Sequence, residues 1–276
     1  HAAAFKHVTL VERQPLVAIR NNILATHQLA RLASKNGVAH FFLISTDKAV
    51  EPSSVMGASK RVTEKLIESK AYHNGTKFVA VRFGNVIDSR GSVLPKFKRQ
   101  IEKGGPVTVT HRDVIRYFMT IPESVQLLLQ AGAMGNGGEI FILDMGDPIK
   151  ILDLACDLIR LSGLEVERDI PIEFTGLEPG EKLYEELLTA EEGVTATKHQ
   201  RIFVAHLEAI EEKRLLNQIQ MLEDLANHLK ADEIIRELQK IVPTYVPNRF
   251  FVNEPINTSD QKTKTEVINL SSARQI

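Results

Sequence analysis

Residues 38–50 read VAHFFLISTDKAV and residues 77–83 read KFVAVRF, and these two stretches decide the fold. Each contains a short run of branched and aromatic residues, which is typical of a strand buried on both faces. Between them, the apolar residues of 55–73 recur at helical spacing. A strand, a helix and a strand in this order predict two parallel strands joined by a right-handed crossover.

The same alternation continues on both sides of this unit. Further helices are predicted over residues 16–36, 93–102, 122–133 and 151–161, and further β segments over 107–110 and 139–143. Strands separated by helices of this length predict an α/β fold with a doubly wound parallel sheet. Proline and glycine interrupt residues 164–205, residues 207–241 form a charged amphipathic helical stretch, and the chain ends in a polar tail.

Composition excludes several classes of function. The chain has 276 residues, with 34 Lys and Arg against 35 Asp and Glu and a net charge of −1, so no basic excess favours nucleic acid or an anionic membrane. Cys156 is the single cysteine and the nine histidines are scattered, so neither a disulfide nor a metal site is expected. Since no run of about 18 apolar residues occurs, the sequence predicts a cytoplasmic globular protein.

Polar side chains follow the first buried strand directly. Thr46, Asp47 and Lys48 stand where that strand ends, and ligands of parallel α/β sheets bind beyond the carboxyl ends of the strands. A hydroxyl, a carboxyl and an amine would therefore project into one crevice. The alternative is a solvated turn in which Asp47 caps a helix.

This arrangement resembles the active site of the extended short-chain dehydrogenases/reductases, where a Ser or Thr at the strand end works with a Tyr-x-x-x-Lys pair on the next helix. Thr46 and Lys60 match this pattern, whereas Met56 stands in place of the tyrosine. The runs HAAAFKHV, STDKAVEPSSVMGASK, RFGNV, GSVLP, RYFMTIPES and PGEKLYEELL are similar to the CapD-like nucleotide-sugar 4,6-dehydratases of surface polysaccharide and glycan synthesis, some of which have Met there. The resemblance covers residues 1 to about 206.

The resemblance implies a Rossmann-like fold and a UDP-N-acetylglucosamine 4,6-dehydratase with tightly held NAD or NADP. The cofactor would take a hydride from the sugar C4 and return it to C6, after C5 has lost a proton and the C6 hydroxyl has left as water. Lys48 would be the base and Asp47 the acid, which requires a partly neutral Lys48 and a partly protonated Asp47, favoured by burial and, for Lys48, by Lys60 nearby. Thr46 would bind the sugar near C4. Met56 cannot take the C4 hydroxyl proton, so Asp47, Thr46 through a water, or a water beside Lys60 are the candidates.

The resemblance also implies the binding residues. On the cofactor side these are Ala2, Ala3, Ala4, Lys6, Lys60 and Phe83. On the UDP-sugar side they are Asn85, Ser92, Val93, Leu94, Thr108, Val109, Arg116 and Glu181, with Arg116 offering planar donors to phosphate. Asn22 would brace the site from the preceding helix. Glu178 stands where related sequences have a phosphate-facing Arg, so Arg116 or Lys182 would have to compensate.

A dinucleotide-binding fold needs a Gly-x-Gly-x-x-Gly turn after its first strand, and this sequence has none; GNGGEI at 135–140 precedes a strand. We therefore expect the chain to lack its first strands, roughly 80 to 90 residues at about 30 per βαβ step, and to bind NAD(P)⁺ poorly by itself. The expected domains are a partial dinucleotide-binding domain over 1–205, interleaved with nucleotide-sugar-binding segments at about 86–120 and 145–205, then a helical extension over 206–247 and a disordered tail over 248–276.

The expected partners are a UDP-sugar and further copies of the chain, and not nucleic acid. Membrane attachment is expected only through upstream helices, which would place the protein at the cytoplasmic face of the inner membrane. Two alternatives stay open within enzymes, a bifunctional dehydratase/5-epimerase and a UDP-sugar 4-epimerase. A third is a noncatalytic sugar-nucleotide-binding protein that has lost the tyrosine.

Overall fold

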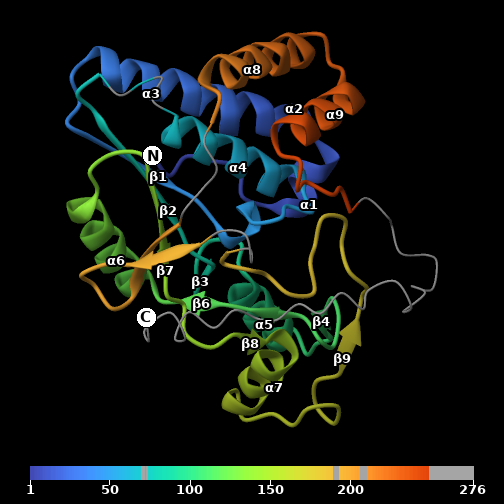
Figure 1. The fold of residues 1–276 in the computed structure, drawn as a ribbon. Helices are drawn as coiled ribbons and strands as arrows, with labels where there is room; N and C mark the ends of the chain where they lie inside the picture. Colours follow the sequence, from blue (N-terminus) through green and yellow to red (C-terminus); the bar gives the residue numbers. More distant parts are fainter. Residues whose placement is uncertain (70–71, 73, 189–192, 206–209, 249–276) are drawn as a thin grey trace.

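The computed structural model describes residues 1–69, 72, 74–188, 193–205 and 210–248 (Figure 1). A five-stranded sheet with the order β1-β2-β7-β11-β10 lies at its centre. Its strands are β1 (His40–Ile44), β2 (Lys77–Arg82), β7 (Glu139–Leu143), β11 (Ile202–Ala205) and β10 (Val194–Ala196). The first three run parallel, as predicted, whereas β11 and β10 are antiparallel additions from a segment whose strands the sequence pattern did not reveal.

Helices cover both faces of this sheet, which confirms the α/β class (Figure 1). On one face lie α1 (Val8–Arg13), α2 (Pro15–Ala18), α3 (Ala25–Lys35) and α4 (Val55–Glu68), and on the other lies α6 (Ile121–Met134). The helix predicted over 16–36 is interrupted by the π-helix η1 (Ile19–Leu24) between α2 and α3. Such π segments widen one helical turn and often occur at functional sites.

The helical extension forms two helices instead of one stretch. These are α8 (Glu212–Asn227) and α9 (Ala231–Ile241), which contact each other, and the break between them includes Leu229 in the left-handed region with φ of 58°. The pair packs on η1, α2 and α4, at the top of the view in Figure 1. The tail predicted to be disordered lies, from residue 249 on, outside the described residues.

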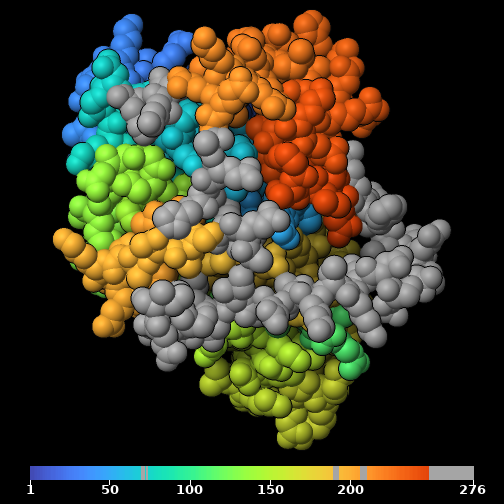
Figure 2. Space-filling view, viewed as in Figure 1, coloured from blue at the N-terminus to red at the C-terminus, as the bar shows by residue number. Residues whose placement is uncertain are grey.

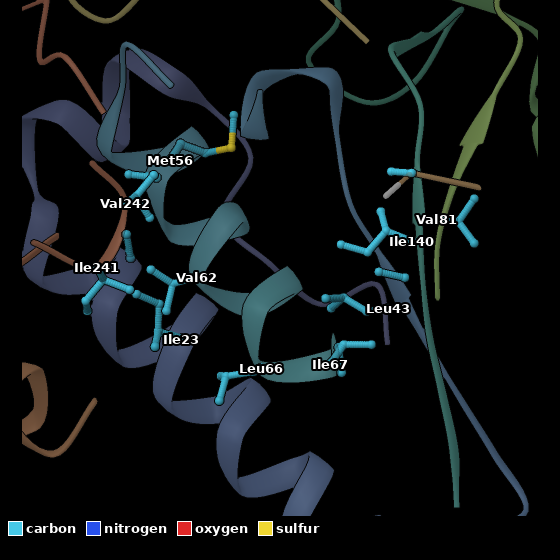
Figure 3. Packing of buried hydrophobic residues seen from close by; sticks show 14 of the residues in the cluster. Ile23, Leu43, Met56, Val62, Leu66, Ile67, Val81, Ile140, Ile241 and Val242 are labelled. Atoms are coloured by element: carbon cyan, nitrogen blue, oxygen red, sulfur yellow. The ribbon is translucent and has the colours of Figure 1, made fainter. Parts of the chain in front are cut away.

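The main hydrophobic core lies around α4. Figure 3 shows its sheet-facing side, where Ile67 lies beside Leu43 with Ile140 nearby, and its outer side, where Val62 and Leu66 lie near helices. The outer contacts are Ile23 of η1 and Ile241 of α9, all fully or almost fully buried. Each such side chain contributes roughly 1.5–3 kcal/mol by leaving water, so α4 is held firmly between two layers.

A second, smaller core builds the lower lobe in Figures 1 and 2. It lies between α5 (Val93–Glu102), α7 (Ile151–Leu161) and the pair formed by β4 (Val107–Val109) and β9 (Ile172–Phe174). Two short sheets complete this part, β3 (Asn85–Val86) with β6 (Phe118–Met119) and β5 (Ile115–Arg116) with β8 (Ile149–Lys150). The β3–β6 pair leads from the end of β2 into the lobe, which brings the lobe next to the carboxyl ends of β1 and β2.

Candidate functional site

The turn after β1 is a short 3₁₀-helix, η2 (Asp47–Ala49), and it carries the polar triplet. Thr46 Oγ1 donates to Asp47 Oδ1 over 2.8 Å, and the same oxygen accepts from the Lys48 backbone N–H over 2.9 Å. Asp47 is fully buried, so the alternative of a solvated turn is wrong. The turn is instead fixed by its own side chains at the carboxyl end of a buried strand.

A cavity of about 480 Å³ lies between this turn and the lower lobe. Most of the predicted site residues line it: Ala2, Ala4, Lys6, Thr46, Lys48, Met56, Lys60, Phe83, Asn85, Ser92, Val93, Thr108, Val109, Arg116 and Glu181. Three do not. These are Ala3, which is exposed, Leu94 of α5, and Asp47, which is fully buried.

Lys48 is surrounded by acceptors. Its Nζ lies 3.0 Å from Asp47 Oδ1, 3.6 Å from Glu185 Oε1 and 3.5 Å from Asn85 Oδ1. Burial lowers the pKa of Lys48, but the carboxylates of Asp47 and Glu185 outweigh it, so the pKa lies above its ordinary value. The expectation of a partly neutral Lys48 is therefore wrong for the free protein, and the opposing cation is Arg116, not Lys60.

Helix α4 places Met56 and Lys60 on the cavity wall one turn apart. Its N-terminus is capped by Ser54, whose side chain accepts from the Gly57 backbone N–H over 3.1 Å. A Cβ at Gly57 would lie 2.1 Å from the Lys48 carbonyl oxygen, so only glycine lets the helix approach the turn this closely. Burial lowers the pKa of Lys60 to about 8, against the opposing effect of Glu64.

Arg116 lines the cavity but its donors are used within the protein. Nη1 donates to the carbonyl oxygens of Ile115 and Leu183, over 2.7 and 3.1 Å. Nη2 donates to the Lys182 carbonyl over 2.7 Å and to Glu181 Oε1 over 3.2 Å. The expectation of a free planar fork for phosphate is wrong for this conformation. Arg116 instead holds residues 181–185 beside the cavity.

The two other residues raised for the phosphate are also placed differently from the expectation. Lys182 Nζ donates to the Val50 carbonyl over 3.2 Å and pairs with Glu186 over 3.7 Å, and it does not line the cavity. Glu178 is exposed and outside the cavity, and its backbone N–H donates to Glu181 Oε2. No carboxylate of Glu178 therefore opposes an anion in the cavity.

Ser92 and Val93 at the N-terminus of α5 line another part of the cavity. Ser92 is the N-cap of this helix, and Ser92 Oγ is buried with no hydrogen-bond partner among the described residues. Lys96 and Lys6 also line the cavity, with Lys6 Nζ donating to Ser89 Oγ over 3.3 Å. Free backbone N–H groups at a helix start and two amines suit an anionic group.

The π-helix positions the bracing residue Asn22. Its Oδ1 accepts from the Phe5 backbone N–H over 2.8 Å, and its Nδ2 donates to the Phe5 carbonyl over 3.1 Å and to Ser59 Oγ over 3.0 Å. Asn22 is buried, and these bonds tie the N-terminal segment with Ala2 and Ala4 to α4. The brace expected from the sequence is present.

Comparison with known proteins places this site in a family. Residues 1–207 match the model of a family described as polysaccharide biosynthesis protein. The chain belongs to this family. The capsular polysaccharide biosynthesis protein CapD of Staphylococcus aureus is 53% identical over 238 residues, 86% of this chain and 39% of that relative. The probable polysaccharide biosynthesis protein EpsC of Bacillus subtilis is 59% identical over 192 residues, 70% of this chain and 32% of that relative.

The chain thus spans less than half the length of those two relatives. Among solved structures, Pen from Bacillus thuringiensis superposes with a TM-score of 0.68 at 34% identity, covering 80% of this chain and 74% of Pen. The UDP-glucose 4-epimerase of Thermus thermophilus superposes with a TM-score of 0.59 at 19% identity, covering 68% and 67%. These similarities confirm the Rossmann fold of extended short-chain dehydrogenases/reductases.

The sequence prediction missed Lys96, which lines the cavity, and Glu185, which lies behind Lys48. The Glu185 side chain is almost fully buried, with Oε1 3.6 Å from Lys48 Nζ and 3.9 Å from Arg116 Nε. Burial raises the pKa of Glu185, and Oε2 has no hydrogen-bond partner among the described residues. The run PGEKLYEELL contains three glutamates, and only the fold shows which of them meets Lys48. Glu185 stands between Tyr184 and Glu186 in a segment broken by Pro and Gly, so no sequence pattern distinguished it.

Two absences hold for the described part of the chain. It contains no group of three His, Cys, Asp or Glu residues placed to hold a metal ion. In the same residues, every helix is too short or too polar to cross a bilayer.

Proposed function

We propose that this chain forms the substrate-binding and proton-transfer part of a nucleotide-sugar 4,6-dehydratase that converts UDP-N-acetylglucosamine to its 4-keto-6-deoxy derivative. One observation carries the proposal: an amine, Lys48, lines the cavity at the end of β1 while bonded to the buried carboxyl of Asp47. The names of the Staphylococcus and Bacillus relatives support a role in surface polysaccharide synthesis.

The cavity residues fit one half of a nicotinamide dinucleotide. Ala2 and Ala4 present no bulky side chain to the cavity, Phe83 offers an aromatic surface, and the Lys60 amine can bond ribose hydroxyls. The Thermus neighbour is described in complex with NAD, which supports NAD or NADP here. Bound NAD(P)⁺ would supply a site that accepts a hydride and gives it back. Lys60, with a pKa of about 8, carries a positive charge at neutral pH.

The anionic end of the substrate fits the start of α5. Ser92 and the backbone N–H of Val93, with Lys96 and Lys6, would hold the diphosphate through hydrogen bonds and charge. Thr108 and Val109 line the cavity beyond them, as expected for the uridine side. This placement directs the sugar toward Thr46, Lys48 and Asn85.

The turn after β1 then handles the protons. Thr46 Oγ1 touches both the cavity and Asp47 Oδ1, so it can pass the C4 hydroxyl proton to the buried carboxylate. Lys48 faces the cavity and would take the proton from C5, which a C4 ketone acidifies. Protonated Asp47 would return its proton through Thr46 or Lys48 to the departing C6 oxygen. Met56 has no proton to exchange, which leaves these roles to the triplet.

A UDP-sugar 4-epimerase is the second candidate. A UDP-glucose 4-epimerase of Rickettsia bellii is 40% identical over 195 residues, 70% of this chain and 56% of that relative. A 4-epimerase needs hydride removal and return at C4, but no base for C5 and no acid for C6. The buried carboxyl and the amine at one end of β1 are an acid and a base that a 4-epimerase does not require. We therefore favour the dehydratase.

The test uses the full-length gene product with UDP-N-acetylglucosamine and NAD⁺, and reads the product by NMR. The proposal predicts a new C6 methyl signal and a C4 ketone, and Lys48→Met should lower kcat by about 10²- to 10⁴-fold. Lys98→Met, at an exposed position of α5, is the matched control and should keep the wild-type rate. A C4 epimer would support the epimerase, and absence of any product would support a noncatalytic binding protein.

A further inference from the structure

Glu185 is a buried carboxylate in contact with Lys48, to which the proposed function gives no role. Its side chain is 4% exposed and its Oε1 lies 3.6 Å from Lys48 Nζ. Asp47 Oδ1 lies on the same amine at 3.0 Å. Each carboxylate also has one oxygen without a hydrogen-bond partner among the described residues, Asp47 Oδ2 and Glu185 Oε2. Such unsatisfied buried oxygens call for an explanation, and catalytic proton exchange is one.

The proposed reaction requires two proton acceptors before the C6 oxygen can leave. The C4 hydroxyl gives up one proton when its hydride departs, and C5 gives up another. Met56 lies on the cavity wall but has no titratable proton, so it cannot accept the first one. If Asp47 receives the C4 proton through Thr46, it cannot also relieve Lys48 of its ammonium proton. Lys48 must then lose that proton to another group.

We propose that Glu185 takes the ammonium proton of Lys48 during turnover and returns it at the end of the cycle, an inference that rests on the proposed function. In the first step an N–H bond of Lys48 breaks and an O–H bond forms on Glu185, so the pair stays neutral overall. The Lys48 amine takes the C5 proton, and the resulting ammonium, whose protons exchange with solvent, later gives one proton to C5 as a hydride reaches C6. Asp47 receives the C4 proton and gives it to the C6 oxygen, which leaves as water.

Every proton and hydride that is removed in these steps is therefore returned. Hydride leaves C4 and returns to C6 through the nicotinamide cofactor of the proposed function, so no other oxidant is needed. Glu185 acts through Lys48 and does not line the cavity, which makes it a positioning residue and not a catalytic one. Its burial favours the uncharged carboxyl, which supports its capacity to hold a proton.

Several charged groups face this pair and define what a titration will report. Asp47 contacts Lys48 from η2, Arg116 approaches Glu185 from β5, and Lys182 acts on Glu185 from its own segment. Tyr117 is close enough to Asp47 to feel its charge. Arg116 and Lys182 favour the charged Glu185, whereas Asp47 favours its protonation. E185Q removes the proton acceptor and leaves all four of these groups in place.

The experiment measures kcat and KM from pH 6 to 9.5 for the full-length gene product and its E185Q variant. The wild type should show a plateau around neutral pH because its proton moves internally. E185Q should lose about 10- to 100-fold in kcat at pH 7, with KM within about threefold, and should regain rate by about tenfold per pH unit as Lys48 loses its proton to solvent. E185D should keep the plateau at a reduced rate, because it retains the acceptor.

Two controls separate this role from a structural one. E186Q changes the adjacent glutamate, which pairs with Lys182 and lies outside the cavity, and should keep the wild-type profile. E181Q removes the other carboxylate on Arg116, and should raise KM while keeping the plateau. A wild-type profile for E185Q, or a rising profile for E181Q, would overturn the proposal.

A second readout is independent of turnover. The reactivity of Lys48 toward an amine-modifying reagent, followed by mass spectrometry against pH, reports its pKa in the free protein. Because Glu185 raises the pKa of Lys48, E185Q should move the labelling curve to lower pH, and an unchanged curve would overturn the proposal. If the wild type yields no dehydrated product, the proposed function fails while the labelling experiment still decides the Lys48–Glu185 link.

Discussion

Two buried ionic clusters in the described part of the chain, one around Glu64 and one around Lys48, are built differently. In the first, the Glu64 carboxylate accepts from Arg82 Nε and Nη2, over 3.1 and 2.8 Å, from Arg61 and from Ser45. In the second, Asp47 and Glu185 share Lys48, and each keeps an oxygen with no partner in the described residues. The first cluster is saturated with donors and the second is short of them.

The difference between the clusters shows in their pKa directions. Although burial alone would raise it, Arg82 and the other donors lower the pKa of Glu64 to about 2. Burial raises the pKa of Glu185, and Lys48 does not reverse it. A carboxylate with a full set of hydrogen-bond donors stays ionised, and its role is to stabilise the structure. A carboxylate that lacks donors can take one up, which is the property that proton-transfer chemistry needs.

The largest expected effect is the difference in unfolding free energy between variants of the two clusters. Glu64→Gln should lower the free energy of unfolding by about 3–5 kcal/mol, because it leaves the fully buried Arg82 without its counter-charge. Glu185→Gln should cost about 1 kcal/mol or less, since it removes a carboxylate that is not fully bonded. Denaturant unfolding of both variants measures the contrast. Equal losses would mean that Glu185 is as structural as Glu64.

The second prediction concerns acid. The folded pKa of Glu64, about 2, lies below its ordinary value of 4.5, so its contribution is fully present above about pH 4.5 and is lost as pH falls toward 2. The loss should be on the order of 3 kcal/mol. Unfolding free energies of the wild type and Glu64→Gln, measured from pH 5 to pH 2.5, should therefore converge as pH falls. A difference in unfolding free energy that stays constant with pH would contradict the low pKa of Glu64.

The third prediction tests how α4 supports the second cluster. Gly57→Ala places a methyl group against the Lys48 carbonyl oxygen, so either the helix or the turn must move. We expect a loss of about 1–3 kcal/mol in the free energy of unfolding and a larger fractional loss of activity than the unfolded fraction explains. Thermal unfolding and kcat, measured on the same preparation, test this prediction. Unimpaired activity would show that the function of Lys48 does not depend on the close contact with α4.

The smallest effect comes from two matched helix caps. Ser54 caps α4, which carries Met56 and Lys60, and Thr120 caps α6, which lies away from the cavity. Replacing either by Ala should cost about 1 kcal/mol of stability. Only Ser54→Ala should also reduce kcat, and an equal effect of Thr120→Ala on kcat would show that the site responds to general destabilisation alone.

The parts of the fold that the sequence predicted are those with strong periodic patterns. Residues 40–44, 77–82 and 139–143 are short apolar runs, and helical spacing identified α4, α5, α6 and α7 to within a few residues except at the C-terminal end of α4. The antiparallel strands β10 and β11 were missed because their segment is broken by Pro and Gly. The split between α8 and α9 was missed because Leu229 lacks the glycine signal of a left-handed break.

The site could be predicted as a set of residues but not as a charge distribution. The strand ends and the Met56–Lys60 spacing located the cavity wall, since parallel strands bring their carboxyl ends to one edge. The charge of Lys48 was predicted wrongly because the carboxylates of Asp47 and of Glu185, the latter 137 positions later in the sequence, together outweigh the effect of burial on its pKa. The role of Arg116 was also misjudged, since the backbone carbonyls that take its donors cannot be read from side-chain types.

The central claim is that Lys48 removes a proton from C5 of a UDP-linked hexosamine. Incubation of the full-length gene product with UDP-N-acetylglucosamine and NAD⁺ in D₂O, followed by NMR and mass spectrometry of the product, tests it directly. The account predicts a 4-keto-6-deoxy sugar that carries deuterium at C5, and loss of this product in Lys48→Met. A C4 epimer that retains hydrogen at C5 would contradict it.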